Sequence, residues 1–277
     1  MNNPLSFSAI KLNRLSREGE SLNSASGFVV EAGNQYYLIT NWHVVSGRDI
    51  NTHELLEPDL EPVTLNTAIH IRQGEGEKKA PLTMGRWKRL TVQLYDDDNM
   101  PRWIELPANN EQLLKIDVVA IPLKSNLNSF QLVSAIQNNF IDSISTRSNM
   151  NFWSEISAIS ISAIDTEIEY GPSDLINVVG HPYGWSPNGT DKSTSAFWRR
   201  SSIASEIKET GIGITTEHPF FIDPCPLDGM TGSPVLGLKN DCIRLLGIYS
   251  DISTAGFGAN AGLVWNASVL KDLISLS

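Results

Sequence analysis

Residues Asp228–Val235, DGMTGSPV, place a threonine between two glycines, with a proline three residues after it. Two glycines around a hydroxyl residue let the backbone turn sharply and aim two N–H groups at one point. Such a pair of amides stabilises the negative charge that develops on a carbonyl under attack. A plain Gly/Pro turn between two strands is the simpler interpretation, and other parts of the chain have to decide between the two.

The composition is that of an ordinary globular protein. The chain has 277 residues, of which 41% are hydrophobic and 19% charged, and these values argue against disorder. Lys plus Arg number 21 and Asp plus Glu 31, so the net charge is −10. Because phosphate binding needs clustered cations, we expect no nucleic-acid partner.

The sequence predicts neither a membrane span nor secretion. No stretch approaches the roughly 18 consecutive apolar residues of a spanning helix, and the start of the chain lacks the apolar run of a secretion signal. A secreted protein of this size often carries more than the two cysteines present, Cys225 and Cys242. We therefore expect a cytoplasmic protein with both thiols reduced and buried, and a Cys225–Cys242 bridge is the alternative.

Short β-type runs dominate the chain. Gly27–Val30 and Tyr36–Thr40 flank a loop with Gly33-Asn34, which predicts a hairpin. Only Ala267–Leu276 has helical periodicity. Together they predict an all-β fold of two small antiparallel barrels or sandwiches with a C-terminal helix. The polar residues 124–150 are expected to connect the halves. The other expected strands are Ala68–Arg72, Leu90–Tyr95, Trp103–Leu106, Asp117–Leu123, Ile156–Ile168, Leu175–Gly180, Ala196–Ala204, Phe220–Ile222, Val235–Leu238, Arg244–Ser250 and Gly262–Trp265.

Two residues at strand ends carry candidate chemistry. His43 lies in Thr40-Asn-Trp-His-Val-Val, directly after an apolar strand. Imidazole titrates near neutral pH and suits a general base, although a buried core histidine would look the same. Asp117 opens the apolar run Asp-Val-Val-Ala-Ile-Pro, where it is either a turn residue or a carboxylate that orients a histidine. The order His, Asp, hydroxyl residue, each beside a strand, is a stronger signal than any one of them.

These motifs together resemble the trypsin-like (chymotrypsin-fold) serine peptidases, of the cytosolic bacterial type, over residues 22–275. The resemblance implies two antiparallel six-stranded β-barrels with an active site between them. Residues 1–140 would form the barrel that carries His43 and Asp117, and residues 141–277 the barrel with the nucleophile loop and the terminal helix. The motifs that carry it are Ser26-Gly-Phe-Val-Val, Leu38-Ile-Thr-Asn-Trp-His-Val-Val, Asp117-Val-Val-Ala-Ile-Pro-Leu, Val178-Val-Gly-His-Pro-Tyr-Gly, Gly229-Met-Thr-Gly-Ser-Pro-Val and Gly247-Ile-Tyr-Ser.

The resemblance also implies roles for single residues. His43 would be the base and Asp117 its orienting carboxylate, and the N–H groups of Gly229 and Thr231 would form the oxyanion hole. Ser250 would lie against the aspartate. The edge from Ser250 to Ile252 would pair with a substrate peptide as an added strand. Asp251 would lie at the side-chain pocket, where it either favours a basic substrate residue or is a solvated charge.

The nucleophile position holds Thr231, because the family pattern places a proline three residues after the nucleophile. Ser233 would then be structural, and only a shift of register would make it the nucleophile. The additional methyl group of threonine restricts χ1 and has to fit beside His43. The two functional hypotheses are an endopeptidase with a His43–Asp117–Thr231 triad and a silent pseudoprotease that binds a peptide or partner protein in the same cleft.

The expected partners follow from these hypotheses. A peptide or protein is the substrate, and the resemblance implies a regulatory protein partner in bacterial defence or stress. We expected such a partner to order cleft loops, including an insertion at Asn51–Pro81. The other histidines, His53, His70, His181 and His218, show no zinc-ligand spacing, so no metal or cofactor is expected.

Overall fold

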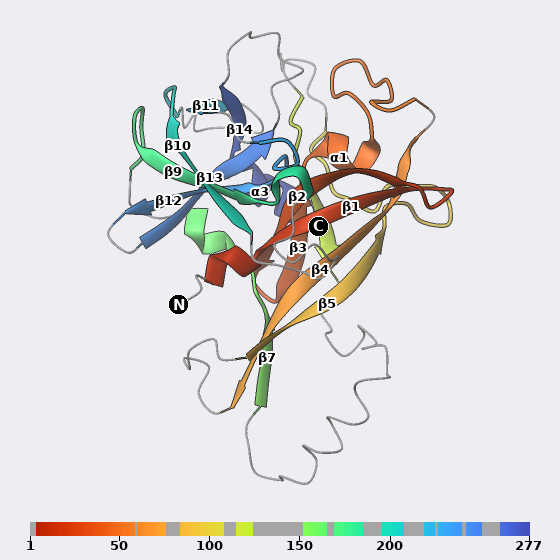
Figure 1. The fold of residues 1–277 in the computed structure, drawn as a ribbon, viewed down its shortest axis with the longest axis horizontal. Coiled ribbons are helices and arrows are strands. Elements are labelled where there is room, and N and C mark those ends of the chain that lie inside the picture. The colour runs from red at the N-terminus through yellow and green to blue at the C-terminus, as the bar shows by residue number, and fades with distance from the viewer. Residues whose placement is uncertain are drawn as a thin grey trace.

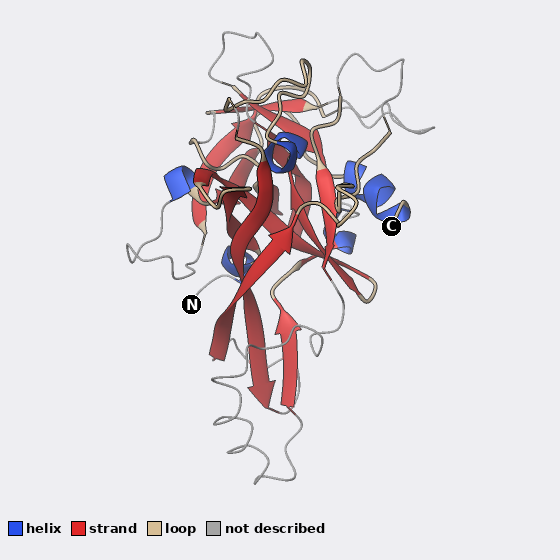
Figure 2. Cartoon of the chain, turned by 90° about the vertical axis from the view of Figure 1, so that its right-hand side faces the viewer, coloured by secondary structure: helices blue, strands red, loops and turns tan. Residues whose placement is uncertain are grey.

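The computed structural model consists mainly of strands, with short helices scattered around them (Figure 2). In Figure 1, β9 to β14 gather on the left, and β1 to β5 run through the centre and right. The strands form two sheets, as the sequence predicted. The structure describes residues 4–58, 60–75, 84–107, 115–123, 152–164, 169–184, 196–207, 219–224, 227–239, 242–250 and 261–277.

The first sheet has eight strands, six of them in the order β5-β4-β1-β2-β3-β6. The predicted hairpin is β2–β3, in which Ala32 pairs with Gln35 and Gly33 has a φ of +61°. The long strand β4 occupies much of the segment that we had interpreted as an insertion. The strands are β1 (Ala9–Ser16), β2 (Ser21–Ala32), β3 (Gln35–Thr40), β4 (Pro62–Glu75), β5 (Met84–Gln93), β6 (Val119–Leu123), β7 (Phe152–Ile156) and β8 (Ile159–Ser160).

A short irregular segment links the two ends of this sheet. The amide of Arg102 donates to the carbonyl of Leu94, just after β5, at 2.9 Å. Ile104 exchanges two backbone hydrogen bonds of 2.8 and 3.0 Å with Ala120 of β6. The predicted strand at Trp103–Leu106 is therefore a single bridge, and the first sheet is a half-barrel whose outer strands β5 and β6 are linked by this segment.

The second sheet is a closed barrel in the order β10-β11-β14-β13-β12-β9. All of its pairings are antiparallel, as expected. Each strand includes most of a predicted one, because each apolar run is bounded by turn residues. The strands are β9 (Leu175–Gly180), β10 (Phe197–Ile203), β11 (Phe220–Asp223), β12 (Pro234–Lys239), β13 (Cys242–Ser250) and β14 (Gly262–Asn266).

Two strands belong to a different half than their sequence position indicated. β7 pairs with β4, and β8 pairs with β2 as the only parallel pair between described strands. Residues 152–160 are therefore part of the first sheet, although we had assigned 141–277 to the second barrel. The expected strand Ile156–Ile168 is also shorter, because Ile161–Ile164 forms the 3₁₀ turn η2. The connector 124–150 lies outside the described residues.

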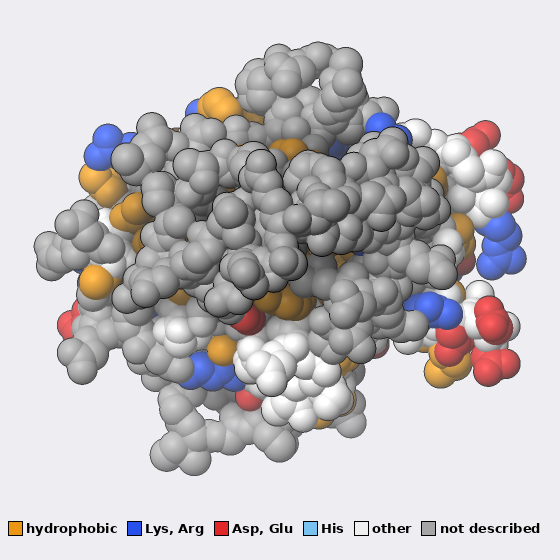
Figure 3. Space-filling model, turned by 90° about the horizontal axis from the view of Figure 1, so that it is seen from below, with side chains coloured by type: hydrophobic (Ala, Val, Ile, Leu, Met, Phe, Trp, Pro, Cys, Tyr) orange, Lys and Arg blue, Asp and Glu red, His pale blue; other side chains and the backbone are white. Residues whose placement is uncertain are grey.

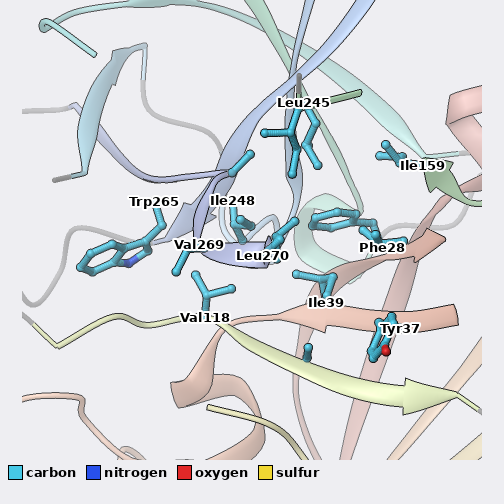
Figure 4. Packing of buried hydrophobic residues seen from close by; sticks show 14 of the residues in the cluster. Phe28, Tyr37, Ile39, Val118, Ile159, Leu245, Ile248, Trp265, Val269 and Leu270 are labelled. Carbon is cyan, nitrogen blue, oxygen red and sulfur yellow. The ribbon is translucent and has the colours of Figure 1, made fainter. Parts of the chain in front are cut away.

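The predicted C-terminal helix is α3, Val269–Ser275. Its apolar face packs into a cluster shared by both sheets, in which Figure 4 shows Phe28 and Ile39 of the first sheet with Ile248 of the second. Leu270 of α3 is fully buried in this cluster. The helix therefore helps to hold the two sheets together. The remaining helical segments are η1 (Pro4–Phe7), α1 (Trp42–Ser46) and η3 (Pro182–Gly184).

Replacing Leu270 by alanine is expected to lower the free energy of unfolding by about 2–5 kcal/mol, because it leaves a cavity in the shared cluster. Leu276 is 55% exposed just beyond the helix, so Leu276→Ala is the matched control, with an expected change of at most about 0.5 kcal/mol. Urea unfolding monitored by tryptophan fluorescence measures both. Equal changes in the two variants would contradict the described packing of α3.

Charges on the described surface form local pairs. Basic and acidic side chains are intermixed on the coloured part of the face in Figure 3. Lys239 donates to Asp174 at 2.8 Å, and this hydrogen bond lowers the pKa of Asp174. Burial lowers the pKa of Arg14, while the facing Glu57 carboxylate opposes that shift. No described helix is long and apolar enough to cross a membrane.

Candidate active site

His43 is positioned by the connection from β3 into α1. Asn41 is the N-cap of this short helix and is fully buried, and its side-chain amide donates to the backbone carbonyl of Asp117. The helix ends at Gly47, whose φ is +69° and on which a Cβ atom would lie 2.4 Å from the Pro62 ring. These constraints hold His43 in the first turn, immediately beside the end of β3.

Asp117 lies beside His43 because β3 and β6 are neighbouring antiparallel strands. Thr40 pairs with Val119, so Asp117, two residues before β6, meets the residues just after β3. The side chain of Asp117 is 5% exposed and that of His43 22%. The strand pairing therefore places a buried carboxylate against a histidine that solvent can reach.

Both oxygens of the Asp117 carboxylate accept hydrogen bonds. The His43 backbone amide donates to Oδ1 at 3.0 Å, and Nδ1 of its ring lies 2.7 Å from Oδ2. Ser250, at the end of β13 in the second barrel, donates its hydroxyl to Oδ2 at 2.6 Å. With Nδ1 held by the carboxylate, Nε2 is the ring nitrogen left for proton transfer to another molecule.

From Gly229 to Gly232, amides that donate to a described acceptor alternate with amides that do not. Met230 donates to the carbonyl of Leu227 at 3.1 Å, and Gly232 donates to that of Tyr249 at 2.9 Å. The alternate amides, those of Gly229 and Thr231, donate to no acceptor within the part of the chain that the structure describes. Free amides at alternate positions of a tight loop are suited to bind one anionic oxygen.

Thr231, which carries one of these amides, is half-buried, whereas Ser233 is fully buried. A Cβ atom on Gly180 would lie 1.9 Å from Ser233 Oγ, so the serine packs tightly against β9. Among the described residues, no hydrogen bond joins the Thr231 hydroxyl to His43. The loop thus presents Thr231, not Ser233, at the more accessible position.

The structure describes only some of the other residues that the sequence singled out. Asp251, Ile252 and Cys225 lie outside the described residues. Cys242 is a free thiol, but it is exposed at the start of β13 and not buried as expected. His70 is buried with Nδ1 2.8 Å from Ser157 Oγ, and Nε2 of His53 lies 2.6 Å from Lys115 Nζ. The described residues contain no group of three or more side chains that could hold a metal ion.

The sequence interpretation gave no role to two residues that the site uses. Asn41 holds the backbone of Asp117, and Ser26 of β2 donates its hydroxyl to the carbonyl of Gly229 at 2.8 Å. Ser26 begins the buried run SGFVV within β2, and a hydroxyl in such a strand needs a partner. A serine at the start of this apolar run was the sequence signal that could have indicated a hydrogen-bonding role for Ser26.

Gly232 is required by both its backbone conformation and its surroundings. Its φ is +89°, and a Cβ atom there would lie 2.1 Å from the carbonyl oxygen of Ser26. Gly232→Ala is expected to lower the free energy of unfolding by about 3–5 kcal/mol, from strain and overpacking together. Gly33 also has a positive φ of +61° but no atom within 4 Å. Gly33→Ala is therefore the matched control, with an expected loss of about 1 kcal/mol, and similar losses in urea unfolding would contradict the close contact.

No protein-family model matches the chain, and no curated protein gives a significant match. Among solved structures, it is similar to an inactive serine-to-alanine mutant of Rv3671c from M. tuberculosis, at 12% identity over 98% of this chain and 86% of that one, with a TM-score of 0.46. It is similar to the scabies mite inactivated protease paralogue S-I1, at 12% identity over 99% and 96% of the two chains, with a TM-score of 0.48. A third is the HtrA-type protease AlgW, a serine-to-alanine variant with a tripeptide, at 16% identity over 98% and 60%, with a TM-score of 0.47. The likeness concerns the fold.

Proposed function

We propose that the chain is a serine-type, trypsin-like endopeptidase with Thr231 at the nucleophile position. The observation that carries the proposal is the hydrogen-bonded set of His43, Asp117 and Ser250, which joins both barrels. In the second barrel, the loop around Thr231 adds two amides that no described acceptor occupies. A general base, an orienting carboxylate and an oxyanion site are the parts that acyl transfer requires.

In the proposed reaction, Thr231 Oγ1 attacks the carbonyl carbon of a peptide bond while His43 Nε2 accepts the hydroxyl proton. Asp117 stabilises the imidazolium, and the amides of Gly229 and Thr231 bind the oxyanion. His43 then gives the proton to the leaving amine as the C–N bond breaks, which leaves an ester on Thr231. Water, deprotonated by His43, hydrolyses that ester and restores the enzyme.

We propose that the substrate pairs as an added strand with the edge that begins at Ser250. Ser250 is the last residue of β13 and is paired with Leu263 of β14 on one side. Backbone pairing would give affinity that depends little on sequence, and pockets for alternate side chains would give specificity. Asp251 and Ile252 continue this edge in the proposal.

A pseudoprotease is the second candidate function, because the Thr231 hydroxyl makes no hydrogen bond to His43 within the described part of the chain. The additional methyl group costs about 1–3 kcal/mol where it crowds a packed site. That cost corresponds to roughly ten- to a few hundred-fold in rate. If misalignment of Oγ1 adds to it, the cleft would bind a peptide without turnover.

Labelling with a fluorophosphonate probe tests the proposal. The natural chain is incubated with the probe, and the modified residue is located by mass spectrometry, beside His43→Ala and Thr231→Ser. Label on Thr231 that disappears in His43→Ala would support the peptidase. Absence of label from the natural chain, together with strong label on Thr231→Ser, would favour the pseudoprotease. Absence of label from both would sink the peptidase proposal.

A regulatory protein partner, a cytoplasmic setting and a role in bacterial defence stay predictions. The argument that a partner orders the Asn51–Pro81 insertion is weakened, because residues 62–75 of that segment form β4. This strand pairs with β1, β5 and β7. Because these residues already form a paired strand, they are not a loop that a partner could order. A partner would have to act on other segments, and full activity of the purified chain alone would refute its need.

A further inference from the structure

Ser26 connects the two barrels through a single buried hydroxyl. It lies in β2 of the first barrel and is fully buried. Its Oγ donates to the carbonyl of Gly229 at 2.8 Å and accepts from the backbone amide of His181 at 2.9 Å, and both partners belong to the second half of the chain. The hydroxyl therefore donates to one backbone group and accepts from another, and the two lie on separate segments.

The backbone of Ser26 adds two more bonds to the same region. Its amide donates to the carbonyl of Thr231 at 2.9 Å, and its carbonyl accepts from Thr40 Oγ1 at 2.9 Å. Thr40 is the last residue of β3, three positions before His43. Ser26 thus links the strand end before His43 with the nucleophile loop.

Four consecutive carbonyls of that loop accept hydrogen bonds, and Ser26 supplies two of the donors. Asp228 accepts from the amide of Tyr183 at 2.7 Å, and Met230 accepts from that of Ser233 at 3.0 Å. Gly229 and Thr231 accept from the hydroxyl and the amide of Ser26. The N–H and C=O of a trans peptide point in opposite directions, so the carbonyls of Asp228 and Met230 fix the directions of the Gly229 and Thr231 amides. The two carbonyls held by Ser26 belong to the peptides that alternate with these, so Ser26 acts on the oxyanion amides through the adjacent peptides.

The hydroxyl also stabilises the turn that holds the carbonyl of Asp228. His181 begins this turn, and Tyr183 within it has a φ of +50°, which is unfavourable for a residue with a side chain. Tyr183 donates to Asp228, whose carbonyl belongs to the same peptide as the Gly229 amide. Loss of the Ser26 hydroxyl would therefore loosen the loop at Gly229 and the turn at His181 together.

We propose that Ser26 is a positioning residue for the oxyanion site. Its hydroxyl orients the Gly229 carbonyl and the His181 turn so that the amides of Gly229 and Thr231 stay directed at the oxygen of an attacked carbonyl. The proposal rests on the proposed peptidase function for its chemical meaning. Removing one oxyanion donor costs about 10²–10³ in rate, so its partial misorientation is expected to cost about 10–100-fold.

The test compares Ser26→Ala with Ser201→Ala, both in a chain that carries Thr231→Ser. Ser201 is also a buried serine, and its hydroxyl donates to the carbonyl of Pro224 at 2.9 Å, away from the nucleophile loop. The second-order rate constant of fluorophosphonate labelling is expected to fall about 10–100-fold for Ser26→Ala and less than about twofold for Ser201→Ala. The pH profile of the residual labelling should stay unchanged, because His43 and Asp117 are untouched.

A second readout reports the loop without chemistry. The amide signals of residues 229 and 231 in ¹⁵N–¹H NMR spectra are expected to shift in Ser26→Ala and to stay in place in Ser201→Ala, each compared with the parent Thr231→Ser chain. If Ser26→Ala does not fold, Ser26→Cys keeps a side chain of similar shape that hydrogen-bonds weakly, and the same shifts are expected.

The outcomes separate the two proposals. Unchanged labelling and unchanged amide signals in Ser26→Ala or Ser26→Cys would overturn the role of Ser26 while leaving the peptidase intact. If the Thr231→Ser chain itself is not labelled, the peptidase proposal fails, and the amide signals alone then decide whether Ser26 positions the loop. Shifts confined to the Ser26 variants would support it.

Discussion

Thr231→Ser is expected to raise the rate of His43-dependent fluorophosphonate labelling by roughly ten- to a few hundred-fold. Serine keeps the hydroxyl and removes the methyl group that has to fit between the amide pocket and His43. The gain corresponds to the about 1–3 kcal/mol that one surplus methyl costs in a packed site. The measurement is the second-order rate constant, followed by intact-protein mass spectrometry.

Thr231→Val is the matched control for that result. Valine has nearly the shape of threonine but no hydroxyl, so it keeps the crowding and loses the nucleophile. No label is expected at residue 231 in this variant. Label at Ser233 in the valine chain would revive the alternative register, although Ser233 is fully buried against Gly180. Equal rates for the natural chain and Thr231→Ser would show that the methyl does not obstruct the site.

Asp117→Asn is expected to lower the labelling rate of the Thr231→Ser chain by about 10⁴-fold. Among the described residues, the hydrogen-bond partners of the carboxylate are all donors, namely the amide and ring of His43 and the hydroxyl of Ser250. Asparagine replaces one acceptor oxygen with an NH₂ group, which would meet a donor in either orientation. The NH₂ group also favours the tautomer with the proton on Nε2, and that form cannot act as the base.

Ser250→Ala is the control for the charge. It removes one donor to Asp117 but leaves the carboxylate and its bonds to His43, so a loss of about tenfold or less is expected. Urea unfolding of both variants shows whether any loss of rate reflects loss of fold. A decrease of less than tenfold for Asp117→Asn in a folded chain would contradict the orienting role of this carboxylate.

Features of short sequence range were predictable from the residues. The β2–β3 hairpin follows from Gly33-Asn34 between apolar runs, and α3 follows from the periodicity of Val269, Leu270 and Leu273. The strands of the second barrel are apolar runs ended by turn residues, so local pattern located them as well. In each case the signal lies within a few residues of the element.

Strands defined by distant partners were misjudged. Ala9–Ser16 alternates buried and half-buried residues as β1, yet the sequence interpretation left it unassigned. Only Ala68–Arg72 of β4 was expected as a strand, within a supposed insertion, and β7 and β8 were assigned to the second barrel. Nothing within a strand states which other strand it pairs with, because partner choice depends on which surfaces the whole chain can bury.

The sequence by itself determined the all-β class, the two sheets, the terminal helix and the candidate residues His43, Asp117 and Thr231. The resemblance also implied that Ser250 lies against Asp117, and the structure has that hydrogen bond. Only the tertiary structure decided that Asn41 holds the backbone of Asp117 and that Ser26 holds the loop around Thr231, across 76 and 203 residues of chain. The physical reason is that a buried polar side chain takes whichever partner folding brings within about 3 Å. That partner is set by the pairing of strands and the packing of two sheets against each other, which no local pattern encodes.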